Sequence, residues 1–273
     1  MFNKLPLLRN FAAVAMLTAA GLALAAPPSF AETPEEKGLA IVQEADRRDD
    51  GYGDSSATLK MILSNRHGDT STRKMRMKSK EVPDKSVGDK ALIVFDEPRD
   101  VKGTALLTFT KIIEPDDQWL YLPALKRVKR IASVNKSGPF VGSEFAFEDM
   151  ASQEVGKYNY NYLRNEACGE LECFVVEAYP NYEHSGYTKE IVWLDTGEYR
   201  SQKIDYYDRK DTLLKTLTLS EYRQYLGKYW RPHNLVMENH QSGKVSRLIW
   251  TDMKLQVGLD ERDFTKNALK RSR

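Results

Sequence analysis

The stretch Trp119–Met150 reads WLYLPALKRVKRIASVNKSGPFVGSEFAFEDM and joins three kinds of sequence. An aromatic strand, Trp119–Leu122, precedes a basic strand, Lys126–Arg130, and an aromatic and acidic segment, Phe140–Asp149, follows a loop that contains glycine. None of the three places a nucleophile beside a base or gathers a cluster of metal ligands. The stretch therefore favours a surface that lines or gates a site for an amphiphile over a site that performs chemistry.

Apolar and polar residues alternate with period two along most of the remaining chain. In the segment 74–78 this alternation places Met75 and Met77 on one face of a strand. Turn sequences such as those at residues 96–98 and 242–243 separate the segments at steady spacing. The pattern predicts a mainly β protein in which about eleven strands form an antiparallel meander curled into an unclosed β-barrel. The expected strands span residues 74–78, 91–95, 105–113, 119–122, 158–163, 173–179, 189–194, 199–207, 213–222, 229–238 and 245–255.

A helix signal stands at the start of the domain. Thr33 suits the N-cap, Pro34 the first helical position, and Glu36 completes a capping box. The helix is expected to end near residues 50–51 and to lie against the sheet through its apolar stripe. That stripe consists of Leu39, Ile41, Val42 and Ala45.

Two further helical segments are expected. A short helix or loop at residues 142–151 should cover the concave face of the sheet together with the N-terminal helix. A helical turn at residues 259–264 should end the domain.

Residues 1–31 have the layout of a secretory signal peptide. Lys4 and Arg9 precede an apolar run at residues 11–26, and small residues flank a cleavage point after Ala31. A retained anchor is the alternative, but the run is shorter than the roughly 20 residues that span a bilayer. The sequence therefore predicts a protein that is secreted across the inner membrane into the periplasm.

The mature chain, residues 32–273, is predicted to be one domain with balanced charge. The full sequence has 41 Lys plus Arg and 39 Asp plus Glu, and the leader contains two bases and no acid. The mature chain therefore carries 39 of each. This balance argues against a nucleic-acid-binding protein, which would show a broad basic field.

Cys168 and Cys173 are the two cysteines of the chain. In an oxidising compartment a disulfide is favoured over free thiols, and the four residues between them fit a turn that joins two strands. A metal site would need further ligands, and neither His nor Cys lies nearby in the sequence. We expect a structural disulfide that staples a hairpin, with no metal site and no cofactor.

Enzyme signatures such as HExxH, GxSxG, a phosphate loop or a dinucleotide glycine pattern do not occur. The four histidines fall in separate segments, where solvent-facing or turn positions are expected; they are His67, His184, His233 and His240. Glu144, Glu148 and Asp149 form the one carboxylate cluster near aromatic residues. A glycosidase pair is the catalytic alternative, but we expect these acids to form ion pairs with the basic strand. The sequence predicts no enzyme.

Aromatic and thioether side chains are abundant and have two interpretations. They form an ordinary β core, or they line an apolar concavity that an incompletely packed half-barrel leaves open. Methionine suits the second role, because its flexible side chain adapts to varied acyl chains. The residues expected in the cavity or at its rim are Met75, Met77, Trp119, Tyr121, Leu122, Phe140, Phe145, Phe147 and Met150.

The basic strand puts positive charge on both of its faces, which is unusual for a central strand. It is a solvated strand face, a contact for anionic lipid headgroups, or a docking site for an acidic partner. The residues expected to make the headgroup or partner contact are Lys126, Arg127, Lys129 and Arg130.

These residues resemble the periplasmic family of outer-membrane lipoprotein-sorting proteins, which share the LolA/LolB-like fold. The resemblance rests on W-x-Y-L-P-A-L-K-R-V-K-R-I at 119–131 and F-V-G-S-E-F-A-F-E-D-M at 140–150. It extends to Trp193, Asp195, Tyr199, Gly227, Trp230, Pro232, Phe264 and Leu269. The resemblance implies an unclosed barrel with a hydrophobic cavity for acyl chains, and it implies an association with exporters of the RND/MMPL type.

Three functions from different classes follow. The leading hypothesis is a soluble, monomeric periplasmic carrier of a lipid, lipoprotein acyl chain or other amphiphile, with transient contact to a membrane surface. The alternative is a regulatory or interaction module of an inner-membrane protein that carries no cargo. A hydrolase is disfavoured, because no catalytic group has a partner. A cavity in the curled sheet distinguishes the first from the second.

Overall fold

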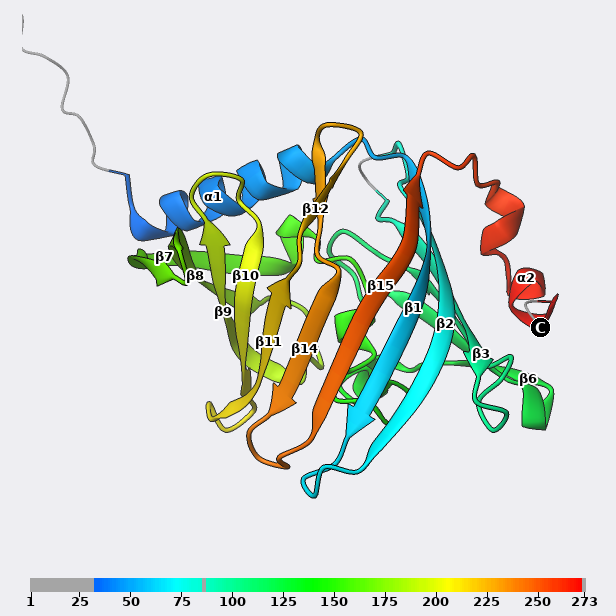
Figure 1. Ribbon diagram of the computed structural model, residues 1–273. Helices are drawn as coiled ribbons and strands as arrows, with labels where there is room; N and C mark the ends of the chain where they lie inside the picture. The colour runs from blue at the N-terminus through cyan, green and yellow to red at the C-terminus, as the bar shows by residue number, and fades with distance from the viewer. Residues whose placement is uncertain (1–31, 85–86, 272–273) are drawn as a thin grey trace, which may run out of the picture. The chain divides into compact units, whose positions relative to one another are not determined.

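The computed structural model describes residues 32–84 and 87–271, and within them the chain forms one large antiparallel sheet that does not close into a barrel. Figure 1 shows the sheet strongly curved, with α1 (Pro34–Asp49) along one end. In spatial order its strands are β6 (Arg127–Arg130), β5 (Asp117–Leu122), β4 (Ala105–Phe109), β3 (Lys90–Glu97), β2 (Thr70–Lys80), β1 (Asp54–Ser64), β15 (Val245–Leu255), β14 (Asn234–Asn239), β11 (Leu213–Ser220), β10 (Ser201–Asp208), β9 (Tyr187–Asp195), β8 (Leu171–Pro180) and β7 (Tyr158–Cys168).

The strand order explains the shape of the fold. The first strand, β1, pairs with the last strand, β15, in the middle of the sheet, while β6 and β7 form its two edges. The chain must therefore cross from one edge to the other between these two strands. Residues 131–157 make this crossing along the concave side, behind β14 and β15 in Figure 1. We call them the crossover segment.

The crossover segment is built of single 3₁₀ turns, so the helix considered at residues 142–151 is not formed. The turns include η3 (Phe140–Gly142) and η4 (Glu148–Met150). The left-handed φ angles of Val141 (47°) and Gly142 (76°) interrupt any longer helix. This irregular path carries Phe140 and Phe145 into the concave core, where both are buried.

Helix α1 forms as the sequence predicts, with the Thr33–Glu36 capping box present in full. Ile41, Val42 and Ala45 pack on the sheet, whereas Leu39 stays exposed, contrary to expectation. Gly38 is buried against the backbone of β7, and a Cβ there would stand 2.8 Å from the amide nitrogen of Tyr162. The helix therefore packs directly on the main chain of the edge strand.

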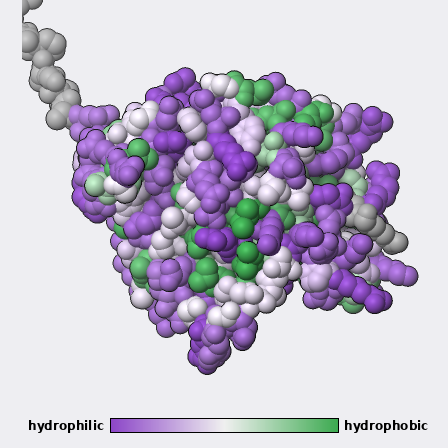
Figure 2. All heavy atoms as spheres, in the orientation of Figure 1, coloured by the Kyte–Doolittle hydropathy of each residue, from purple (hydrophilic) through white to green (hydrophobic). Residues whose placement is uncertain are grey.

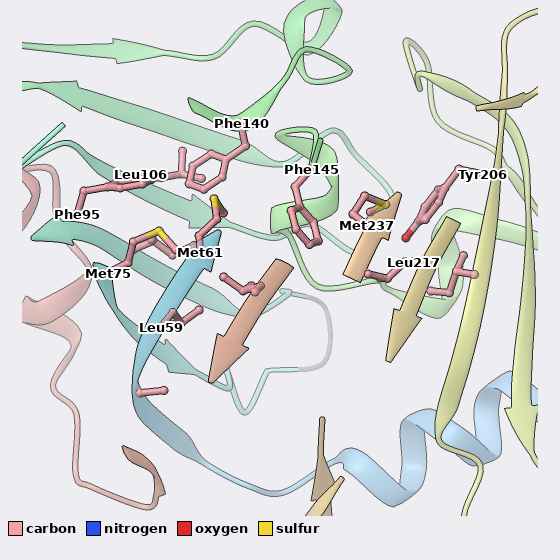
Figure 3. Packing of buried hydrophobic residues seen from close by; sticks show 14 of the residues in the cluster. Leu59, Met61, Met75, Phe95, Leu106, Phe140, Phe145, Tyr206, Leu217 and Met237 are labelled. Atoms are coloured by element: carbon pink, nitrogen blue, oxygen red, sulfur yellow. The ribbon is translucent and has the colours of Figure 1, made fainter. Parts of the chain in front are cut away.

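Other elements pack on the concave side of the sheet and on part of its convex side. On the concave side, Met61, Met75, Phe95 and Met237 form the core with the crossover segment. Figure 3 shows Phe145 with Phe95, Met61 and Met75 on one side and Met237, Leu217 and Tyr206 on the other. On the convex side, η6 (Glu261–Phe264) and α2 (Lys266–Arg271) bring Phe264 and Leu269 onto β3, β4 and β5. The face shown in Figure 2 is mostly hydrophilic, with scattered hydrophobic residues.

The sheet contains thirteen strands, not about eleven, and a separate hairpin adds β12 (Arg223–Tyr225) and β13 (Tyr229–Arg231). Strand β1 was missed because its polar start, Asp54–Ser56, hides the alternation that follows. The segment 229–238 divides at Pro232 into β13 and β14, since proline cannot donate to a ladder. Helix α2 was missed because only six residues form it.

Within the described ranges, no helix is long and apolar enough to cross a membrane. The predicted signal peptide lies outside the described residues.

Replacing Gly38 with Leu should push α1 away from β7, because the new side chain meets backbone that cannot yield. We expect a loss of about 1–3 kcal/mol in the free energy of unfolding, measured by urea denaturation. Ala40→Leu adds the same side chain at an exposed position of the same helix and should change stability by less than about 0.5 kcal/mol. Equal effects of the two substitutions would contradict the close packing.

Candidate functional site: a cavity with an apolar and a polar wall

A cavity of about 1150 Å³ opens between the concave face of the sheet, α1, the β12–β13 hairpin and the crossover segment. Its apolar wall comes from the central strands, whose inward positions alternate as the sequence pattern requires. The residues of this wall are Met77, Leu217, Leu219, Leu235, Leu248, Trp250 and Met253. Phe145 and Met150 of the crossover segment close one side of the space.

Of the residues predicted to line the cavity, three do so: Met77, Phe145 and Met150. Met75 and Phe140 face the same side of the sheet but are fully buried in the core, and Phe147 packs beside them. These three residues belong to the core beside the cavity and do not line it.

Trp119 and Tyr121 do not belong to the cavity. Both lie on the convex side, under Phe264 and Leu269 near the C-terminus. Leu122 does not line the cavity either. Because β5 is buried on both faces, the positions of its aromatic residues do not indicate which face of the strand lies toward the cavity. The prediction that Trp119, Tyr121 and Leu122 line the cavity is wrong.

The basic strand is the edge strand β6, which explains why charge appears on both of its faces. Lys126, Arg127 and Lys129 are exposed, whereas Val128 packs toward α2. Arg130 forms an ion pair with Asp117 of the neighbouring strand, at 2.5 Å. Positive charge thus collects at one edge of the sheet.

The carboxylate cluster does not pair with the basic strand, because the crossover segment carries it toward the other half of the sheet. Asp149 forms a buried ion pair with Lys215 (2.5 Å) and accepts a hydrogen bond from the Tyr187 hydroxyl (2.7 Å). Glu148 accepts from the backbone of Gly186 (3.0 Å) and from Ser185, and burial raises its pKa. Glu144 accepts from Asn239 Nδ2 at 2.7 Å. These contacts tie the segment to β9, β11 and β14.

Sequence reasoning missed Glu190, which lines the cavity from β9 and is 2% exposed. Gln153 Nε2 donates to its carboxyl group at 2.9 Å, and the Tyr158 hydroxyl donates at 3.4 Å. Burial, followed by the charge of Asp149, raises the pKa of Glu190 to about 8. The available signal was its position two residues before Val192, on the apolar face of the strand.

Comparison with known proteins settles the family. A family model described as "uncharacterized protein" matches residues 88–271. A Vibrio parahaemolyticus domain described as an outer membrane lipoprotein-sorting protein is 56% identical; the match covers 87% of this chain and 100% of that one, with a TM-score of 0.84. This chain belongs to the family of outer-membrane lipoprotein-sorting proteins.

Two further solved structures share the LolA-like fold. A DUF1329 family protein from Desulfovibrio piger is 29% identical, with coverage of 87% of this chain and 99% of that one and a TM-score of 0.82. A LolA superfamily protein from Nitrosomonas europaea is 24% identical, with coverage of 85% and 98% and a TM-score of 0.68. Among curated proteins, none matches the chain.

In this LolA-like chain the β12–β13 hairpin stands at the mouth of the cavity, beside the end of α1. Arg231 forms an ion pair with Asp49, and Lys228 donates to the carbonyl of Asp50. His233 is buried at the base of the hairpin, not solvent-facing as expected, because its ring bonds to Tyr225 and to the carbonyl of Trp250. The hairpin is thus fixed at both ends.

The predicted disulfide joins Cys168 to Cys173 across the β7–β8 turn, with a Cα–Cα distance of 5.9 Å. Across the part of the chain that the structure describes, no three His, Cys, Asp or Glu side chains gather as a metal site would require.

Replacing Glu190 with Gln should alter the pH dependence of stability. In the folded wild type, the carboxyl group of Glu190 stays protonated up to a pH of about 8, whereas in the unfolded chain it loses its proton near pH 4.5. Wild-type stability therefore falls as the pH rises through this window, and the Gln variant avoids that loss. Relative to wild type, the free energy of unfolding of the variant should therefore rise by about 2–4 kcal/mol between pH 5 and pH 8, measured by urea denaturation.

Glu177→Gln is the matched control, because Glu177 lies on the neighbouring strand with its side chain on the convex side and its pKa is lowered. The free energy of unfolding of this control, relative to wild type, should be the same at pH 5 and pH 8. If the relative free energy for Glu190→Gln were also the same at both pH values, the carboxyl group of Glu190 would not be buried in its neutral form.

Proposed function

We propose that this protein is a soluble periplasmic carrier that holds the acyl chain of a lipid, a lipoprotein or another amphiphile in the cavity. The observation that carries the proposal is the space of about 1150 Å³ that an apolar wall lines on the concave side of the sheet. Protein interiors leave few voids larger than a water molecule. An apolar hollow of this size is the expected site of a guest molecule.

The wall chemistry suits a chain of variable length. Met77, Met150 and Met253 present flexible thioethers, and Leu219 with Leu235 adds branched surface. Each buried methylene contributes about 0.8 kcal/mol, so ten of them hold a chain by about 8 kcal/mol. Such a guest leaves when a partner offers equal cover, which is how a carrier transfers cargo without chemistry.

Family membership supports the same function and the periplasmic location. The Vibrio relative is described as a lipoprotein-sorting protein, and it matches along its full length. We infer transfer toward the outer membrane, with cargo received from an inner-membrane exporter of the RND/MMPL type. The carboxylates of the crossover segment serve as structural ties in this account, so the proposal includes no enzymatic step.

An interaction module that carries no cargo is the alternative function. It would require a sheet whose inner side is filled by its own side chains. The open cavity favours the carrier, since Leu219 and Leu235 face a space that residues 32–84 and 87–271 leave unfilled.

Filling the cavity tests the carrier. Leu219→Trp adds a large ring to the lining and should reduce uptake of a fluorescent acyl probe at least tenfold, because the chain loses its space. Thr218→Trp places the same ring at the preceding, exposed position, whose side chain points to the opposite face. This control should bind as wild type does, and native mass spectrometry should find co-purified lipid in it. Wild-type protein that takes up no probe and carries no lipid would refute the carrier.

The basic edge is proposed to contact anionic headgroups. Lys126, Arg127 and Lys129 are exposed beside Leu125, an arrangement that fits a membrane surface. Their joint replacement by Glu should weaken cosedimentation with phosphatidylglycerol vesicles at low salt at least tenfold, given about 1 kcal/mol for each basic residue near the surface.

The control for this edge uses Lys60, Arg247 and Lys254, which are exposed on the central strands. Their replacement by Glu makes the same change in net charge at another place. If both triple variants lose vesicle binding equally, net charge alone drives the contact and the basic edge has no special role.

A further inference from the structure

We propose that the cavity selects amphiphiles that carry a cationic amine, and that the amine nitrogen binds the carboxylate of Glu190. This inference rests on the proposed carrier function and specifies the chemical class of the cargo. It begins from the contrast between the two walls of the cavity. One wall is apolar, while the other, made by β7, β9, β10 and the crossover segment, combines tyrosine rings with carboxyl groups.

Glu190 is the centre of the polar wall. Its side chain is almost completely buried, and its hydrogen-bond partners, Gln153 and Tyr158, are uncharged. Among the described residues, no basic side chain forms an ion pair with it. A carboxylate in such a place is unfavourable without a counter-charge. The folded protein meets this requirement with a proton, and an ammonium group on a ligand is the alternative.

Acidic side chains of the crossover segment stand near Glu190. The crossover segment contributes Glu148, Asp149 and, further along the cavity wall, Glu154, whose pKa burial raises to about 7. The nearby base, Lys215 of β11, is occupied, because its ammonium group bonds to Asp149 and to the carbonyl of Glu144. The remaining titratable groups that interact with Glu190 are phenols, from Tyr158, Tyr160, Tyr182 and Tyr206.

The rings themselves favour a cation. The face of an aromatic ring attracts an ammonium group within about 6 Å of its centre. Lys215 already uses this attraction, with its nitrogen 5.1 Å from the ring centres of both Tyr187 and Tyr206. Tyr158 and Tyr206 line the cavity beside Glu190, so an incoming amine meets rings as well as the carboxylate.

The bases that line the cavity do not prepare it for an anionic head. Each of the six already bonds to an acid or a carbonyl group: Arg47 and Arg48 to Glu44, Lys90 to Glu261, Arg200 to Asp195, Lys228 to the carbonyl of Asp50, and Arg231 to Asp49. An anionic head would compete with the acids that pair with five of these bases and would also face the acidic wall. A cationic head pairs with Glu190 as that residue releases its proton.

Proton release gives the binding a defined pH dependence. Below the pKa of about 8, bringing Glu190 to its ionised form costs free energy, so cation binding strengthens as the pH rises and levels off above that value. The limiting slope is tenfold in affinity per pH unit. The affinity for an uncharged amphiphile lacks this dependence.

Three amphiphiles with the same chain test the inference: dodecylammonium, dodecanol and dodecanoate. Each is added, below its micelle concentration, to wild-type protein with a neutral naphthylamine fluorophore bound, at pH 6 and pH 8. Its affinity is measured from the loss of fluorescence as it displaces the fluorophore. We expect dodecylammonium to bind at least tenfold more tightly than dodecanoate at pH 8, and to gain at least tenfold between the two pH values. Glu190→Gln should abolish that gain, whereas Glu177→Gln should behave as wild type.

The outcomes separate the two proposals. Absence of binding by all three amphiphiles refutes the carrier itself. Binding of dodecanol with no preference for the amine, or with a preference for dodecanoate, keeps the carrier and overturns the inference. A pH-dependent preference that persists in Glu190→Gln overturns the role of Glu190. Should that variant fail to fold, a wild-type protein whose amine binding does not strengthen between pH 6 and pH 8 still overturns the inference.

Discussion

The route of the crossover segment is the constraint on which the rest of the structure depends. Its polar backbone runs over an apolar sheet face, so its carbonyl groups need partners. Inward-facing side chains of the sheet supply them: Gln118 donates to Phe147, Lys215 to Glu144 and Arg73 to Val141. Because these donors hold the main chain, Phe140 and Phe145 can fill one part of the hollow sheet.

That filling is partial, and it determines where a guest fits. The segment divides the concave side into the main cavity next to α1 and a smaller hollow of about 580 Å³ toward the opposite end of the strands. Phe145 lines both spaces, and the buried pair of Asp149 with Lys215 stands at the boundary. The same residues that complete the core thus also shape the polar wall around Glu190.

The sequence was sufficient for the architecture and for part of the site. Period-two alternation identified most strands, and Thr33–Glu36 identified α1, since both signals are local. Trp119 was placed on the wrong side because β5 is buried on both faces, and alternation cannot tell which face is hollow. Glu190 was missed because its role arises from burial by the crossover segment, which is distant in sequence. Long-range contacts of this kind leave no local pattern.

The pairing of β1 with β15 has a consequence for how the protein folds. These strands join residues about 190 positions apart, such as Lys60 with Ile249, at the centre of the sheet. Two half-sheets grow by local hairpins, but the seam between them closes only after the final strand is available. Contacts of such long range make folding slow. Until the seam closes, the edges of β1 and β15 remain exposed, so the unfinished chain is vulnerable to aggregation at its centre, not at its outer edges.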